Sequence, residues 1–140
     1  MKRFLAPILL MVFLFPSFAL AASRGLEMDD LVIREGLYYE KFTDVPFSGK
    51  IEGLQRGSFK DGKKDGPWVA YHDNGQLYYR GTFKDGERDG PWVAYRDNGQ
   101  LSSEGTYKDG KKDGLWVSYH EDGTVNEAYT GTYKDGVKVE

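Results

Sequence analysis

The histidines and their acidic or hydroxyl neighbours are the first residues to test for chemistry, because imidazole supplies general bases and metal ligands. The chain has two, His72 and His120, with Arg96 at the matching position between them. In a strand repeat they would lie four strand spacings apart, roughly 19 Å, which one metal ion cannot bridge. Ser118 precedes His120 by two residues but has no nucleophile-elbow glycines around it. The pattern therefore predicts neither a histidine-held metal nor a catalytic triad.

A second candidate is the run from Asp85 to Gly90, which places oxygen ligands at alternating positions as a calcium loop does. The twelfth position holds Arg96 in place of a bidentate glutamate, and the sister loops carry lysine where this one has Glu87. The lysine pairs at 63–64 and 111–112 are flanked by aspartates, so they are balanced charges, and the glycines lack the spacing of a phosphate loop. We expect charged turns here, with no metal, cofactor or catalytic residue.

Composition narrows the function classes further. The 140 residues carry 19 Lys+Arg and 22 Asp+Glu, a net charge of -3, whereas a nucleic-acid binder normally shows a basic face. Cysteine is absent, which excludes disulfides and thiolate nucleophiles. The 18 glycines and 15% aromatic residues favour short strands separated by many turns. We expect no nucleic-acid partner and an all-β fold.

The first 21 residues have the three parts of a secretory signal peptide. A basic start at Met1–Arg3 precedes an apolar run, and Ala19–Ala21 fits a cleavage site. An uncleaved anchor is the alternative, but the run of 17 residues, apolar apart from Ser17, is at the lower limit for spanning and contains Pro7 and Pro16. We expect cleavage after Ala21, export to the periplasm or the medium, and a linker over residues 22–30.

An internal repeat of 24 residues dominates the rest of the chain. Residues 59–82 and 83–106 are identical at 18 of 24 positions, residues 107–132 form a third copy with two extra residues, and residues 133–140 begin a fourth. Residues 31–58 precede the repeats and are expected to form lead-in strands. No stretch between the glycines is long enough for an unaided helix.

Each repeat should fold as a β-hairpin. Asn74–Gly75 predicts a two-residue type I′ turn, in which both residues have positive φ, and the charged run from Asp61 to Gly66 predicts the second turn. Pairing outward from Asn74–Gly75 places Trp68 opposite Gly81, so that the indole can cover the bare glycine. The other pairs of this structural column are Trp92 with Gly105 and Trp116 with Gly131, the last because an even insertion preserves the face. The expected fold is an elongated antiparallel β-meander.

The same alternation places a row of tyrosines on the opposite face of the sheet. Tyrosine offers a large contact area at low entropic cost, so this row is the candidate partner-binding surface. Its members are Tyr71, Tyr78, Tyr95 and Tyr119.

The repeat pattern resembles the bacterial MORN-repeat variant. The pattern is G-x-W-x-x-Y-x-x-N-G-x-L followed by G-x-F/Y-K-D-G, and it runs here from Gly66 to Gly86 and recurs. The segment 34–49 resembles the lead-in element of such proteins. The chain is similar to YwqK-family antitoxins of toxin–antitoxin systems. The resemblance implies tandem MORN-type β-hairpins that bind a partner and have no chemistry of their own; MORN proteins in general are implicated in scaffolding, self-association and membrane-lipid contact.

These observations predict an exported, non-enzymatic protein-interaction or scaffold module, antitoxin-like by resemblance. The alternative is a cell-wall carbohydrate-binding module, since aromatic repeat faces also bind cations and sugars; such modules usually place the tryptophan after the hairpin turn. Membrane contact is disfavoured after signal cleavage, because the mature charge, 17 against 22 or -5, is repelled by anionic lipids. Open sheet edges at residues 33–39 and 133–139 could support self-association.

Overall fold

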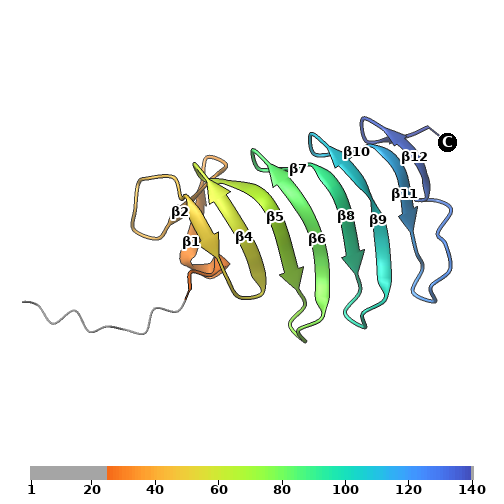
Figure 1. Cartoon of the computed structure of the whole chain (residues 1–140), viewed down its shortest axis with the longest axis horizontal. Coiled ribbons are helices and arrows are strands. Elements are labelled where there is room, and N and C mark those ends of the chain that lie inside the picture. The colour runs from red at the N-terminus through yellow and green to blue at the C-terminus, as the bar shows by residue number, and fades with distance from the viewer. Residues whose placement is uncertain (1–24, 140) are drawn as a thin grey trace, which may run out of the picture.

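The computed structural model describes residues 25–139, which form an elongated array of antiparallel strands (Figure 1). The expected signal peptide lies outside the described residues. One sheet of 11 strands runs in the order β13-β12-β11-β9-β8-β6-β5-β4-β3, with β7 and β10 pairing beside β6 and β9. Its strands are β3 (Gly49–Ile51), β4 (Gln55–Lys60), β5 (Lys63–Tyr71), β6 (Leu77–Lys84), β7 (Glu87–Arg88), β8 (Gly90–Tyr95), β9 (Leu101–Lys108), β10 (Lys111–Lys112), β11 (Gly114–Ser118), β12 (Gly131–Lys134) and β13 (Val137–Lys138). The all-β antiparallel meander is therefore confirmed.

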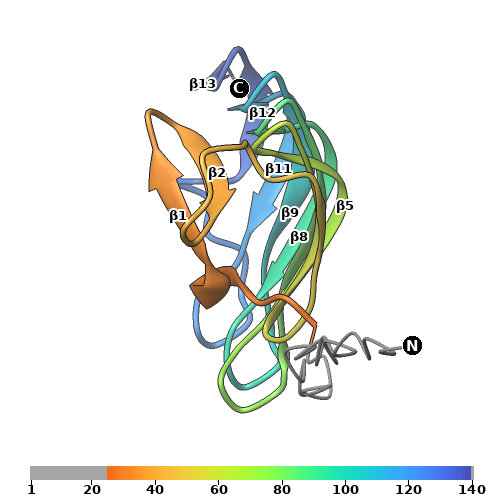
Figure 2. The same cartoon turned by 90° about the vertical axis from the view of Figure 1, so that its left-hand side faces the viewer.

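A separate hairpin precedes the array. After a short 3-10 helix (Met28–Asp30), β1 (Leu31–Arg34) pairs with β2 (Leu37–Glu40) in a sheet of their own. Figure 2 shows this hairpin on the hollow side of the bowed strands. Backbone hydrogen bonds of 2.8 Å from Tyr38 N to Gly62 O and from Phe47 N to Tyr38 O tie it to the array. The first edge of the large sheet is consequently β3, and the expectation that residues 33–39 form that edge is wrong.

The tight turns lie at the Asp-Gly pairs. Asp61 and Gly62 have φ of 49° and 79°, and Lys60 pairs directly with Lys63, as a type I′ turn requires. The same geometry recurs at residues 85–86, 109–110 and 135–136. Each turn stacks on the one before it, because Gly86 N donates to Lys64 O at 2.9 Å and Gly110 N to Arg88 O at 2.9 Å.

The expected type I′ turn at Asn74–Gly75 is wrong. Only Gly75 has positive φ, 82°, and His72 is bridged to both Gly75 and Gln76 by backbone hydrogen bonds of 2.8 Å, which is a three-residue loop with a bulge. The Asn74 side chain explains the choice, since its Oδ1 accepts from Gln76 N at 3.0 Å and holds the turn open. As a result, the pairing of β5 with β6 shifts by one residue between Ala70 and Tyr71.

The buried side chains gather on the hollow side, which we call the inner face and define by Trp68, Trp92 and Trp116. The predicted pairs Trp68 with Gly81, Trp92 with Gly105 and Trp116 with Gly131 are confirmed. The covering is different from the expectation, however: each indole lies over the glycine of the strand on its other side, which precedes it in the sequence. A Cβ atom built on Gly57 would overlap the Trp68 ring, one on Gly81 the Trp92 ring, and one on Gly105 the Trp116 ring.

The hydrogen bonds of the indoles explain this displacement. Trp68 Nε1 donates to Ser58 O at 3.2 Å, and Trp116 Nε1 donates to Thr106 O at 2.9 Å. The Trp68 and Trp116 rings therefore each reach across a bare glycine to the carbonyl of the residue after it. Between β4 and β5 the backbone pairing is interrupted, because the register shifts between Arg56 and Ser58. The Trp68 ring fills the gap that this leaves.

Candidate functional site

The sheet has two faces of different character. The inner face carries an unbroken series of ring contacts along the array, with centroid separations between 4.8 and 5.9 Å. In order, its members are Tyr38, Phe59, Trp68, Phe83, Trp92, Tyr107 and Trp116. The three indoles expose only 1%, 7% and 2% of their surface. The inner face is thus the core of the protein.

Three cations cover the aromatic rings of the inner face. Lys64 Nζ lies 4.2 Å from the centre of the Trp68 ring, Arg88 Cζ 4.4 Å from that of Trp92, and Lys112 Nζ 4.6 Å from that of Trp116. Burial lowers the pKa of Lys64, with a further contribution from the Arg88 charge. Sequence reasoning treated these residues as solvated turn charges and missed this role. The sequence spacing could have revealed this role. Each cation precedes its tryptophan by four residues, and residues an even number apart in a strand lie on the same face of the sheet.

The opposite face, which we call the outer face and define by Val69, Val93 and Val117, is not covered by another layer of the described chain. A row of directly paired residues crosses six strands of it. The row reads Arg56, Val69, Arg80, Val93, Glu104, Val117. The valines are half-buried and the three charged residues exposed. We call these six residues the central row.

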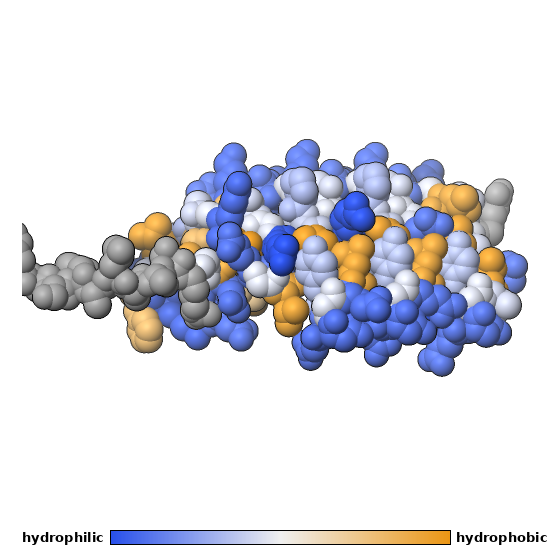
Figure 3. Space-filling model, turned by 60° about the horizontal axis from the view of Figure 1, so that its bottom comes forward, coloured by the Kyte–Doolittle hydropathy of each residue, from blue (hydrophilic) through white to orange (hydrophobic). Residues whose placement is uncertain are grey.

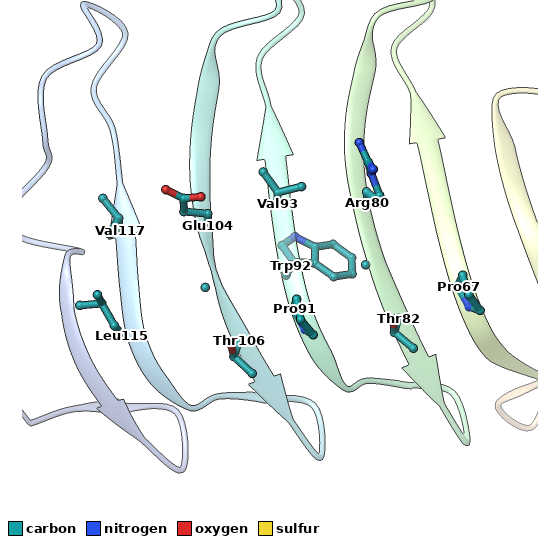
Figure 4. Close-up of a pocket in the computed structure, with 12 residues that line it drawn as sticks. Pro67, Arg80, Thr82, Pro91, Trp92, Val93, Glu104, Thr106, Leu115 and Val117 are labelled. Atoms are coloured by element: carbon teal, nitrogen blue, oxygen red, sulfur yellow. The ribbon is translucent and has the colours of Figure 1, made fainter.

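A second row runs parallel to the central row and leaves a groove between them. It contains Pro67, Thr82, Pro91, Thr106 and Leu115. Figure 4 shows the two rows of side chains facing each other across the groove. The hollow has a volume of about 770 Å³, and its floor includes the backbone of Gly81 and Gly105. Figure 3 shows an apolar band along the array with polar residues on both sides.

The candidate tyrosines border this surface without forming one continuous row. Tyr71 lies under the Arg56 guanidinium, 5.0 Å from Cζ to ring centre. Tyr78 is displaced by the register slip and is 48% exposed, with its ring 4.6 Å from that of His72. Tyr119 donates from its hydroxyl to Glu104 Oε1 at 3.3 Å. Partial burial, together with the Glu104 carboxylate, raises the pKa of Tyr119.

The residues first considered for chemistry serve the backbone instead. His72 Nε2 donates to Tyr95 O at 3.0 Å, and the corresponding Arg96 Nη2 donates to Tyr119 O at 2.9 Å. The matching position of successive repeats thus ties each hairpin to the next. Within residues 25–139, no three His, Asp or Glu side chains are grouped closely enough to hold a metal ion. No helix of the described part has the length and apolar character needed to cross a membrane.

Comparison with protein families agrees with this geometry. The MORN repeat variant matches residues 64–85, 88–109 and 112–135, and the MORN repeat matches residues 56–67 and 104–115. The chain carries MORN repeats. Each variant match begins at the lysine or arginine that covers a tryptophan on the inner face, and it ends just after the next inner-face aromatic residue. Each match therefore contains one tryptophan together with the cation that covers it.

The MORN repeats have the same period as the units found in the sequence, with a different starting point. Among curated proteins, no relative matches the chain. The MORN assignment therefore rests on the repeat pattern and the fold.

Proposed function

We propose that this MORN-repeat protein is an exported, non-enzymatic interaction module that binds a partner protein along its outer face. The groove between the two outer rows carries the proposal. It combines half-buried valines, two prolines and exposed charges, the mixture of apolar contacts and polar rim that protein interfaces use. A similarity to YwqK-family antitoxins supports a partner that is itself a protein, so the role would be scaffold-like or antitoxin-like.

Binding of wall carbohydrate is the second candidate, and the inner face weakens it. Sugar and choline sites use exposed aromatic faces, whereas here the indoles are buried and already covered by Lys64, Arg88 and Lys112. Only the tyrosines near the outer face, such as Tyr71 and Tyr78, would remain for a sugar.

A paired binding experiment separates the two candidates. Immobilised protein is incubated with cell-envelope extract, and in parallel the protein is sedimented with purified wall polysaccharide. We expect a protein to be retained by the wild type, lost with Val93→Asp in the groove, and retained by Glu87→Lys, a charge change at a turn where the sister repeats have lysine. Sedimentation with the wall that is abolished by Tyr71→Ala with Tyr95→Ala would contradict the proposal.

Export is tested separately from binding. N-terminal sequencing of the protein recovered from periplasm and medium should begin at Ala22. A chain found only in the cytoplasm with Met1 retained would refute export and leave the binding proposal standing.

A further inference from the structure

The outer-face groove repeats itself along the array. One hollow is lined by Gly57, and a longer hollow is lined by Gly81 and Gly105. Pro67 and Arg80 line both hollows, so the groove continues from one to the other. Each of the three glycines is also the residue that an indole covers from the inner face. The groove therefore presents three equivalent points at the 24-residue period.

The strand order fixes the spacing of these three points. Gly57 lies in β4, Gly81 in β6 and Gly105 in β9, and one strand separates each from the next. Neighbouring points are therefore two strand spacings apart, about 9.6 Å. Viewed along the array, the strands of the large sheet overlie one another (Figure 2). A ligand that follows the groove must consequently present a side chain on one of its faces about every 9.6 Å.

This spacing distinguishes between the regular backbone conformations. A polyproline II segment has three residues per turn and rises about 3.1 Å per residue, so its side chains recur on one face every 9.3 Å or about so. In a β-strand they recur every 6.7 Å or about so, and the third residue points away. An α-helix is about 10–12 Å wide, whereas the two rows that border the groove are about 7 Å apart. Polyproline II is the conformation that matches.

We propose that the groove binds an extended, proline-rich segment of the partner protein in the polyproline II conformation, with every third side chain over one of the three glycines. The inference rests on the proposed function, because it names the part of the partner that occupies the same face. Such a segment is preformed and loses little entropy on binding. Its contact needs only the strip between the two rows, whereas a folded partner would need a larger area.

The walls of the groove suit such a segment. Pro67, Pro91 and Leu115 are exposed on one side, and the half-buried valines of the central row on the other side offer apolar contact to pyrrolidine rings. A polyproline II backbone makes no internal hydrogen bonds, so its carbonyl groups need donors. The hydroxyls of Thr82 and Thr106 line the groove and form no hydrogen bond within residues 25–139, which leaves them available as donors.

The charges of the central row specify the charges of the segment. A charged residue precedes each of the three glycines, and in order these residues are Arg56, Arg80 and Glu104. They repeat at the same spacing as the glycines, so residues three apart in a polyproline II segment can face them in turn. Charge complementarity then requires an acidic residue at the first two positions and a basic residue at the third.

The three charged side chains are available for this contact. Within residues 25–139 the exposed Arg80 side chain forms no hydrogen bond and no ion pair. Arg56 donates through Nε to Gly53 O at 3.2 Å, which leaves its two terminal nitrogens. Glu104 accepts one hydrogen bond from Tyr119 through Oε1, which leaves Oε2.

A synthetic peptide tests the inference. The probe is the fluorescently labelled peptide Pro-Glu-Pro-Pro-Glu-Pro-Pro-Lys-Pro, in which every uncharged residue is proline, so that either neighbour of each charge can lie over a glycine. Binding is measured by fluorescence anisotropy with the full chain. We expect saturable binding that weakens with added salt. The peptide with the charges exchanged, Pro-Lys-Pro-Pro-Lys-Pro-Pro-Glu-Pro, should bind at least about tenfold more weakly, because like charges then face each other.

A third peptide separates backbone conformation from charge. Gly-Glu-Gly-Gly-Glu-Gly-Gly-Lys-Gly keeps the order and separation of the charges along the chain but is a flexible coil. We expect its affinity to be lower than that of the proline peptide by about tenfold or more, since it must be ordered on binding. Equal affinity of these two peptides would show that charge alone is recognised, and would overturn the inference.

Charge exchange between protein and peptide locates the contact. Arg80→Glu should weaken binding of the proline peptide by roughly tenfold, and replacing the central glutamate of the peptide by lysine should restore it. This restoration excludes misfolding of the variant as the cause. The matched control is Glu87→Lys, which changes charge at a turn away from the central row and should leave the affinity unchanged. In NMR spectra of the wild type, the peptide should shift the amide signals of Gly57, Gly81 and Gly105.

Two further outcomes overturn the inference: no binding of the proline peptide, or shifted amides confined to positions outside the groove. If the protein nevertheless retains a partner from the envelope extract and loses it with Val93→Asp, the proposed function stands and the partner presents a different surface. If neither the peptide nor any protein is bound, the proposed function fails as well.

Discussion

At the residue scale, the glycines beneath the indoles are the positions with least freedom. Gly81 is buried, its φ is not in the left-handed region, and the Trp92 ring occupies the place of its missing side chain. The requirement is therefore close approach of a ring, which no other residue permits. The sequence predicted that tryptophan and glycine share a face. Which of the two neighbouring glycines lies beneath the ring depends on where the pairing of adjacent strands is interrupted, and alternation alone does not give that.

Replacing Gly81 by alanine tests this contact. The new methyl group would force the Trp92 ring out of the inner face, and overpacking of this kind costs about 2 kcal/mol. The free energy of unfolding, measured in urea, should fall by that amount. Thr82→Ala, next in the strand but on the outer face, should change it by less than about 0.5 kcal/mol. Equal effects of the two substitutions would contradict the close approach.

Lys64 makes a pH-dependent contribution to stability. Burial lowers its pKa in the folded state below the ordinary lysine value of 10.5, so the folded protein binds fewer protons than the unfolded chain as pH approaches 10.5. Stability linked to Lys64 must therefore rise with pH in that range. We expect the unfolding free energy of the wild type, relative to Lys64→Met, to increase as pH rises toward 10.5. A constant difference would show that attraction to the rings balances the cost of burial, and a falling difference would show that the attraction is larger; either result would contradict the expectation.

At the scale of the elements, the two turns of each repeat differ from the expectation: the tight type I′ turn lies at Asp-Gly, and the longer loop lies at Asn-Gly. Asn-Gly is the stronger type I′ signal in general, yet here Asp-Gly adopts that turn and Asn-Gly closes a longer loop. The difference arises because the Asn74 side chain bonds to Gln76 N, whereas Lys60 and Lys63 pair directly across Asp61–Gly62. Strand existence, face and the Trp68–Gly81 pairing were predictable, since all three follow from alternation.

Asp85 provides a test of the turn assignment. Its φ of 49° is tolerated by Asp and Asn but costs a β-branched residue about 1–2 kcal/mol. Asp85→Val should lower the free energy of unfolding by that amount, and Asp85→Asn should leave it nearly unchanged. Lys84→Val, in the adjoining strand, is the control for added hydrophobicity. A stable Asp85→Val would mean that the turn is not left-handed at this position.

At the scale of the whole molecule, residues 25–139 form one long curved sheet, with one face buried and one face open, and a separate two-stranded hairpin. The inner face is closed by its own aromatic residues and cations, and by the β1–β2 hairpin at one end. Sequence reasoning identified the open face through its tyrosines. It did not identify the groove, because the groove depends on two rows of residues that come from alternate positions of six different strands. The placement of β1–β2 was also beyond prediction, since it depends on contacts such as Tyr38 with Phe59.

Footprinting of the bound protein tests the outer face most directly. Hydroxyl radicals would be applied to the protein alone and in complex with whichever protein it binds, and oxidation would be read at each residue by mass spectrometry. We predict protection at Pro67, Val93 and Leu115, with the inner-face tryptophans unchanged. Protection confined to the sheet edges or to the tyrosine Tyr78, with the groove still oxidised, would contradict the account.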